Sequence, residues 1–270
     1  MRKLVIVFCF IFAASLHAKV MLHSTFDSAA AINKPAAASC KNALSVWTAG
    51  EGKIAFEDGM FGKAARLHGK DKNIEILKIN SMAVDFTNSG RIDFWLKFNE
   101  DPHKIKDGSY FYILCDISES RNFKMGVSGL GDDQAQLTLW LGASERGSDK
   151  QLYNIASDVK EPRVFLKIKP GEWHRYTIIW IKNAEKDDEL KTYIDGETVE
   201  GSSRGARLTD VTGKLPSGIA EEKWSDIHIG GNKEGSDTGD FSIDELWIFN
   251  DPNDSPEKNG LAVPENMKIK

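Results

Sequence analysis

Apolar and polar residues alternate with a period of two along much of the chain. In the clearest run, residues 91–98, every even-numbered residue is apolar, and the odd-numbered residues are Arg91, Asp93, Trp95 and Lys97. Residues 135–141 repeat the pattern, with leucines on one face and, on the other, Gln136, Thr138 and Trp140. Because successive side chains of a strand point to opposite faces, both runs predict strands with one buried face and one polar face.

Strands of this kind account for most of the chain. Further strands are predicted at 20–26, 53–56, 64–67, 73–77, 110–116, 123–128, 173–181, 191–194, 224–229 and 241–249. Turn residues separate them, and Asp195-Gly196 is typical of a two-residue hairpin. Many short strands with a polar face indicate an all-β sandwich of two antiparallel sheets. The simplest organisation is one domain over residues 19–250, followed by a polar C-terminal extension at 251–270 that we expect to be partly disordered.

The N-terminus has the pattern of a signal peptide. Arg2 and Lys3 precede an uncharged apolar run, Leu4–Leu16, and small residues surround a cleavage point after Ala18. The run is short for a membrane span, so residues 1–18 predict export to the periplasm or the cell exterior. An uncleaved membrane anchor is the alternative.

Composition narrows the classes of partner. The chain has 270 residues, with 7 Trp and 14 Phe, and a formal net charge of -5. It can therefore build a sizeable core but has no basic field for nucleic acid or anionic lipid. After the signal segment two cysteines remain, Cys40 and Cys115. An oxidising compartment permits a disulfide between them, and Cys115 is equally compatible with a buried free thiol.

Several segments, in order, resemble the laminin-G-like or concanavalin-A-like jelly-roll domains of exported bacterial proteins. They are Leu22–Asp27, Gly59–Gly69, Gly90–Lys97, Gly171–Trp180, Tyr193–Gly196, Ile227–Asn232 and Phe241–Asn250. Together they cover roughly residues 20–250. The resemblance implies a two-sheet jelly-roll sandwich, but this fold hosts lectins, glycanases, adhesion modules and structural domains, so it does not by itself fix a function.

The resemblance also implies a calcium site. Domains of this kind often carry a structural Ca²⁺ that joins the first and last strands, and the matching positions are Asp27 and Asp244. Carboxylate and backbone carbonyl oxygens are the ligands that Ca²⁺ prefers. Without a metal, we expect Asp27 to form an Asx turn at a strand end and Asp244 to be a hydrogen-bonded polar residue.

Motifs for catalysis are missing from the sequence. Glycanases of this general fold use carboxylates spaced along one strand face, but Asp244 and Glu245 are adjacent and should point to opposite faces. The histidines after the signal segment are scattered, with no spacing typical of zinc ligands. We therefore expect a protein without enzymatic activity, with a divergent glycoside hydrolase as the enzymatic alternative.

Aromatic rings on polar strand faces suggest a carbohydrate ligand. Trp95 lies beside Asp93, and Trp140 lies beside Gln136, so each ring has hydrogen-bonding neighbours on its own face. Stacking rings flanked by polar groups are what a sugar site needs. The alternative is that loops or the other sheet cover both rings, which would favour a structural or protein-interaction domain of the cell envelope.

Overall fold

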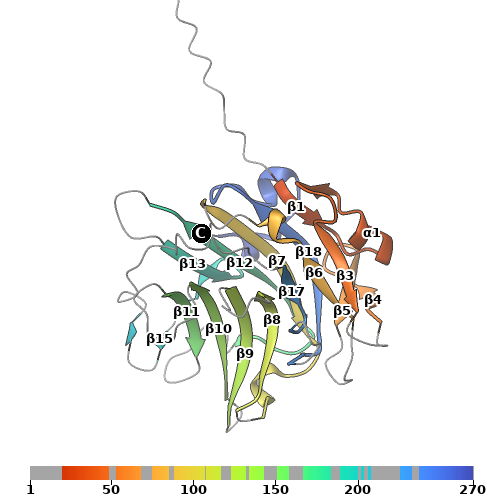
Figure 1. The fold of residues 1–270 in the computed structure, drawn as a ribbon. Coiled ribbons are helices and arrows are strands. Elements are labelled where there is room, and N and C mark those ends of the chain that lie inside the picture. The colour runs from red at the N-terminus through yellow and green to blue at the C-terminus, as the bar shows by residue number, and fades with distance from the viewer. Residues whose placement is uncertain are drawn as a thin grey trace, which may run out of the picture.

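The protein is described by a computed structural model (Figure 1). The structure describes residues 20–48, 53–67, 75–84, 88–106, 108–116, 123–131, 134–142, 151–157, 167–183, 189–199, 202–203, 206–207, 226–232 and 237–269. Within these residues most regular elements are strands, and nearly all of the strands form two large antiparallel sheets. This confirms the all-β, two-sheet sandwich predicted from the alternation. The predicted signal peptide and residues His68 and Gly69 lie outside the described residues.

Sheet A has the long central strands. In the order of pairing its strands are β14 (Glu197–Thr198), β13 (Glu189–Ile194), β12 (Trp173–Ile181), β7 (Gly90–Phe98), β18 (Phe241–Phe249), β1 (Val20–Ser24) and β2 (Ala37–Ala38). β5 (Lys63–Leu67) also pairs with β18, and β4 (Ala55–Asp58) pairs with β5. Asp195 and Gly196 turn between β13 and β14 with φ of 49° and 73°, as a two-residue hairpin requires.

Sheet B faces sheet A across the core. Its strands, in the order of pairing, are β11 (Gln151–Ser157), β10 (Gln134–Gly142), β9 (Phe123–Gly131), β8 (Tyr110–Asp116), β17 (Ile227–Ile229), β6 (Glu75–Ile79) and β3 (Leu44–Thr48). A small separate pair is formed by β15 (Ser202–Ser203) and β16 (Ala206–Arg207). The helical elements are α1 (Ala29–Asn33), η1 (Ser81–Ala83), η2 (Pro102–Lys104), η6 (Glu257–Asn259) and η7 (Glu265–Met267).

The main core fills the space between the two sheets. The even-numbered apolar residues of β7 point into it, and Phe94 stacks on Tyr176 of β12 with ring centroids 5.4 Å apart. From sheet B, Phe111 and Ile113 of β8 and alternating residues of β9 complete the packing. The period of two therefore sorts inner from outer positions on both sheets, as predicted.

The C-terminal residues do not form a disordered extension. Residues 251–269, which we name the C-terminal strap, run across the outer face of sheet A and bury Val263 and Met267 against Trp95, Trp247 and Phe249. This second core corrects the expectation of a polar, partly disordered tail. The tail is polar in composition, but a few well-placed apolar side chains suffice to dock it on a face that already carries aromatic rings.

Cys40 and Cys115 are not joined by a disulfide: Cys115 is buried in β8, and Cys40 is half-buried. The permitted disulfide is therefore not formed. None of the helices in the described ranges is long and apolar enough to cross a membrane.

Candidate functional site

Two of the four predicted sugar contacts, Trp95 and Asp93, are buried beneath the C-terminal strap. Each has 0% of its surface exposed. The ring of Trp95 meets Phe61 edge-on at 5.1 Å, and the Arg175 guanidinium lies 5.2 Å from the same ring. With the strap in place neither side chain can contact a ligand, which corrects the assignment of these two residues to a binding face.

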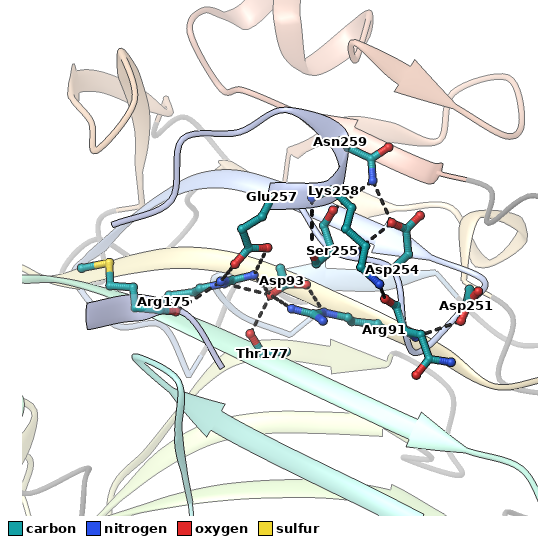
Figure 2. Close-up of polar contacts among 12 residues, drawn as sticks. Arg91, Asp93, Arg175, Thr177, Asp251, Asp254, Ser255, Glu257, Lys258 and Asn259 are labelled. Atoms are coloured by element: carbon teal, nitrogen blue, oxygen red, sulfur yellow. Dashed lines mark hydrogen bonds and ion pairs between the residues drawn. The ribbon is translucent and has the colours of Figure 1, made fainter. Parts of the chain in front are cut away.

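Asp93 is the centre of a buried charge network (Figure 2). Its carboxylate accepts hydrogen bonds from Arg91 Nε at 2.5 Å, from Arg175 Nε at 3.0 Å and from Thr177 Oγ1 at 2.6 Å. Arg175 also donates to both carboxylate oxygens of Glu257 in the strap. Two guanidinium groups thus meet two carboxylates, and the second carboxylate comes from the strap.

The strap carboxylate is held in its charged form by this contact. Burial alone would raise the pKa of Glu257, but the hydrogen bonds and positive charge of Arg175 outweigh burial and lower that pKa to about 2. Arg175 also donates to the backbone oxygen of Met267 at 3.2 Å, so one side chain holds two points of the strap. The outer face of sheet A is therefore closed by packing and by charge pairing together.

The other two predicted contacts, Gln136 and Trp140, lie on β10 of sheet B. Their side chains are outside the described residues, but the strand register is given: Trp140 pairs with Lys124, and Gln136 pairs with Ser128. Leu137 and Leu139 of the same strand point into the core. The register therefore places the backbone of Gln136 and Trp140 beside Ser128 and Lys124 of β9.

A cavity of about 370 Å³ lies on the outer face of sheet B. Its lining residues are Gly108, Ser109, Tyr110, Tyr112, Lys124 and Asp237. Tyr110 and Tyr112 alternate along β8 with core residue Phe111, so both rings belong to the outer face. Lys124 alternates in the same way with core residues of β9. We name this group of lining residues the tyrosine cavity.

The two rings form the aromatic wall of the tyrosine cavity. The Tyr110 and Tyr112 centroids are 4.7 Å apart with an interplanar angle of 69°, and Lys124 Nζ lies 5.8 Å from the Tyr110 centroid. Tyr110 lies across Gly126, where a Cβ atom would come within 2.4 Å of the phenol oxygen. Gly126 thus makes room for the ring. Burial raises the pKa of Tyr110 well above its ordinary value, so the phenol stays neutral.

Asp237 brings an acidic group to the edge of the tyrosine cavity. Its backbone has a φ of 53°, its carbonyl accepts from the Tyr112 N–H at 2.8 Å, and its carboxylate accepts from Asn232 Nδ2 at 3.2 Å. These contacts fix the loop before β18 against β8. The cavity therefore combines two phenol rings with one cationic and one anionic side chain, a set that can stack on a ring and bond to hydroxyl groups.

Sequence reasoning did not single out the residues of the tyrosine cavity. The alternation in 110–116 and 123–128 contains the signal for Tyr110, Tyr112 and Lys124, because each lies between apolar neighbours. Nothing local marks Asp237, whose position follows from a contact between segments more than 100 residues apart in the chain.

The two candidate calcium ligands approach the same turn, residues 59–63. Asp27 Oδ1 accepts from the Lys63 N–H at 3.0 Å, and Asp244 Oδ2 accepts from the Phe61 N–H at 2.9 Å. Asp244 is thus a hydrogen-bonded buried residue, as expected without a metal, whereas Asp27 accepts its hydrogen bond from a turn 36 residues away, which is not the expected Asx turn. The turn places the two carboxylates around one piece of backbone, which is compatible with a calcium site completed by carbonyl oxygens.

Asp244 is a buried carboxylate with a raised pKa. Burial and the neighbouring charge of Glu245 raise its pKa to about 7, although backbone N–H groups donate to it. Among the described residues it forms no ion pair. No group of three or more His, Cys, Asp or Glu side chains in these residues is placed to hold a metal, so two carboxylates are all that the acidic side chains contribute.

Glu245 points to different partners from Asp244. A bulge in β18 gives Glu245 a φ of 47°, and its Oε2 accepts from Trp247 Nε1 at 2.9 Å and lies 2.7 Å from His23 Nε2. The His23 and Trp247 rings stack at 3.5 Å. Because the bulge lies between the core residues Ile243 and Leu246, both carboxylates lie on the outer side of sheet A, which corrects the expectation that they point to opposite faces. They nevertheless bond to different partners.

Comparison with solved structures places the sandwich among known folds. The binding domain of Paraclostridial Mosquitocidal Protein 1 is similar with a TM-score of 0.55 and 17% identity over 88% of this chain and 50% of that one. The Botulinum neurotoxin serotype D binding domain has a TM-score of 0.50 and 16% identity over 89% and 49%. The endo-beta-1,4-glucuronan lyase from the fungus Trichoderma reesei has a TM-score of 0.46 and 10% identity over 88% and 100%.

These similarities define a class of fold, the all-β sandwich found in receptor-binding domains. This chain spans about half the length of the two binding domains. At these identities the likeness concerns the fold alone, and the lyase is too distant to carry an argument. No family model and no curated protein sequence matches the chain.

Proposed function

We propose that this protein is a non-catalytic binding module that holds a carbohydrate in the tyrosine cavity on the outer face of sheet B. The observation that carries the proposal is the pair of half-buried phenol rings, Tyr110 and Tyr112, with Lys124 and Asp237 at the edge of one cavity. Rings supply stacking surface, and the charged side chains supply donors and acceptors for hydroxyl groups.

The backbone register brings the strand of Gln136 and Trp140 next to the strand that lines the tyrosine cavity. Both belong to β10, and the backbone of Trp140 is paired with that of Lys124, which lines the cavity. A saccharide longer than one unit would extend from the cavity along this strand. The binding domains with the same fold are consistent with a binding role.

Export, family membership and a structural metal are proposed on the basis of the amino-acid sequence. We propose that the protein acts after export, in the periplasm or outside the cell, and that it is a member of the laminin-G-like group. A structural Ca²⁺ held by Asp27 and Asp244 would place a positive charge beside the buried Asp244 carboxylate and would join the end of β1 to β18 through the turn at 59–63. That metal would stabilise the sandwich without taking part in a reaction.

The experiment is binding of the purified protein to a broad panel of polysaccharides, first with calcium and then with chelator. We expect saturable binding to at least one glycan, weakened about tenfold or more in Tyr112→Ala, which removes one stacking ring. Tyr193→Ala is the matched control, because Tyr193 is also half-buried but lies on β13 of sheet A. A lower melting temperature in chelator, absent in Asp27→Asn, would support the metal.

A protein-interaction domain of the cell envelope is the second candidate. Burial of Trp95 favours it, because that ring offers nothing to a sugar. A folded protein that binds no glycan of the panel would contradict the carbohydrate proposal and leave this second candidate.

A further inference from the structure

A second cavity lies against the tyrosine cavity. Its volume is about 420 Å³, and its lining includes Phe98, Ile105, Ser109, Tyr110, Phe111 and Thr238. Ser109 and Tyr110 line both cavities, so they form a common wall. A ligand that continues past Tyr110 from the first cavity would enter the second.

The walls of the second cavity are held by backbone contacts. The segment after β7 and the segment before β18 are joined by the Asn99 N–H, which donates to the Asp240 carbonyl at 3.0 Å. Gly239 lies directly on the Phe111 ring, since a Cβ atom there would come within 2.7 Å of it. Because both walls are fixed to the strands, the cavity is preformed and a ligand need not order them.

The floor of the second cavity is apolar. Phe98 and Phe111 belong to the main core, keep only 2% and 8% of their surface exposed, and meet edge-on at 5.9 Å. Ile105 is half-buried beside them and packs on the same core. A small apolar group entering here would remove hydrocarbon surface from water without displacing a polar partner.

The rim of the second cavity carries acidic groups that already have partners. Arg66 donates to both oxygens of Asp240, at 3.1 and 2.9 Å. Asp101 accepts from the His103 N–H at 3.0 Å. Because these carboxylates are compensated, the rim does not require a cation, and the acidic oxygens still disfavour a ligand carboxylate.

We infer that the second cavity receives an uncharged substituent with a small apolar end, such as the acetyl group of an N-acetylated sugar. That substituent is carried by the sugar unit next to the one held between Tyr112 and Lys124. The inference rests on the proposed function and names the class of saccharide: one that presents an acetyl or methyl group rather than a carboxylate at this position.

Three β-1,4-linked disaccharides that differ only at C2 test the inference. The probes are the dimers of N-acetylglucosamine, glucose and glucosamine, with acetamido, hydroxyl and ammonium groups respectively. They are titrated into the purified full chain and followed by NMR at the Ile105 methyl, which reports the second cavity, and the Tyr112 ring, which reports the first. We expect the acetylated dimer to shift both signals and to bind about three to ten times more tightly than the glucose dimer.

A filling variant separates the two cavities. Thr238→Phe places a ring in the second cavity and should abolish the preference for the acetylated dimer while the glucose dimer still shifts Tyr112. Lys106→Phe adds the same ring at an exposed neighbouring position outside the lining and should keep the preference. Equal affinities for the acetylated and glucose dimers, or a preference for the ammonium dimer, would overturn the inference. Absence of a Tyr112 shift with all three dimers would also overturn the inference, whereas only a protein that binds no glycan of the broad panel would contradict the proposed function.

Discussion

The outer faces of the two sheets begin from the same sequence pattern and end in different states. On sheet A, the odd-numbered residues of β7 are covered by the C-terminal strap, and Asp93 and Trp95 are fully buried. On sheet B, the corresponding residues of β8, Tyr110 and Tyr112, line an open cavity. Alternation decides which side chains leave the core but not what covers them afterwards. A polar strand face can therefore become either an interaction surface or a second core.

Charge explains why the covered face of sheet A has a network rather than loose polar groups. Burying Arg91 and Arg175 against Asp93 alone would leave an excess positive charge in a dry environment, which is costly. Glu257 brings the compensating charge from the strap. On sheet B, Lys124 and Asp237 keep contact with solvent and need no such balance. The comparison predicts that polar residues control stability on sheet A and affinity on sheet B.

The largest expected loss of unfolding free energy is that caused by Asp93→Asn. This change leaves two buried guanidinium groups facing one remaining carboxylate, and breaking a buried ion pair in this way typically costs about 3–5 kcal/mol of unfolding free energy. Chemical denaturation measures it. Asp58→Asn is the control, because Asp58 pairs with Lys63 at an exposed position where the ion pair contributes little. A similar, small loss in both variants would show that the network does not hold the strap.

Glu257→Gln is expected to cause a smaller loss of unfolding free energy, and the size of this loss depends on pH. Because the folded-state pKa is lowered from its ordinary 4.5 to about 2, the stabilisation by Glu257 is fully present above pH 4.5 and is lost as pH falls toward 2. Part of the carboxylate reaches solvent, so we expect about 2 kcal/mol at neutral pH. The measurement is the difference in unfolding free energy between the wild type and the variant across this range. A difference that stays constant from pH 7 to 2 would contradict the ion pair.

Strands β7 and β12 show which features of the fold the sequence predicts and which it does not. The alternation in 91–98 correctly separates Phe94 from Trp95, and the hairpin at Asp195-Gly196 is correctly placed. The register that puts Thr177 opposite Asp93 is a long-range pairing that a period of two cannot specify.

The strap was harder to predict. Its buried apolar residues, Val263 and Met267, are set in a polar segment without a strand or helix period. Nothing near Glu257 in the sequence indicates that it will meet Arg175, 82 residues away. Docking of a short segment depends on the shape and charge of the surface beneath it, which exists only after the sheets have formed. For the same reason the sequence pattern predicts that Trp95 contacts a ligand, whereas in the structure its ring is covered by the C-terminal strap.

The smallest effect on stability is expected for Tyr112→Ala on sheet B. Tyr112 is half-buried on the outer face, so its removal should change the unfolding free energy by less than about 1 kcal/mol while it weakens glycan binding. Its neighbour Phe111 points into the core, and Phe111→Ala should cost about 3–5 kcal/mol. Denaturation of both variants, together with glycan titration of Tyr112→Ala, measures the contrast. If Tyr112→Ala lowers stability as much as Phe111→Ala, its ring is part of a packed layer, and the outer face of sheet B is covered in the same way as that of sheet A.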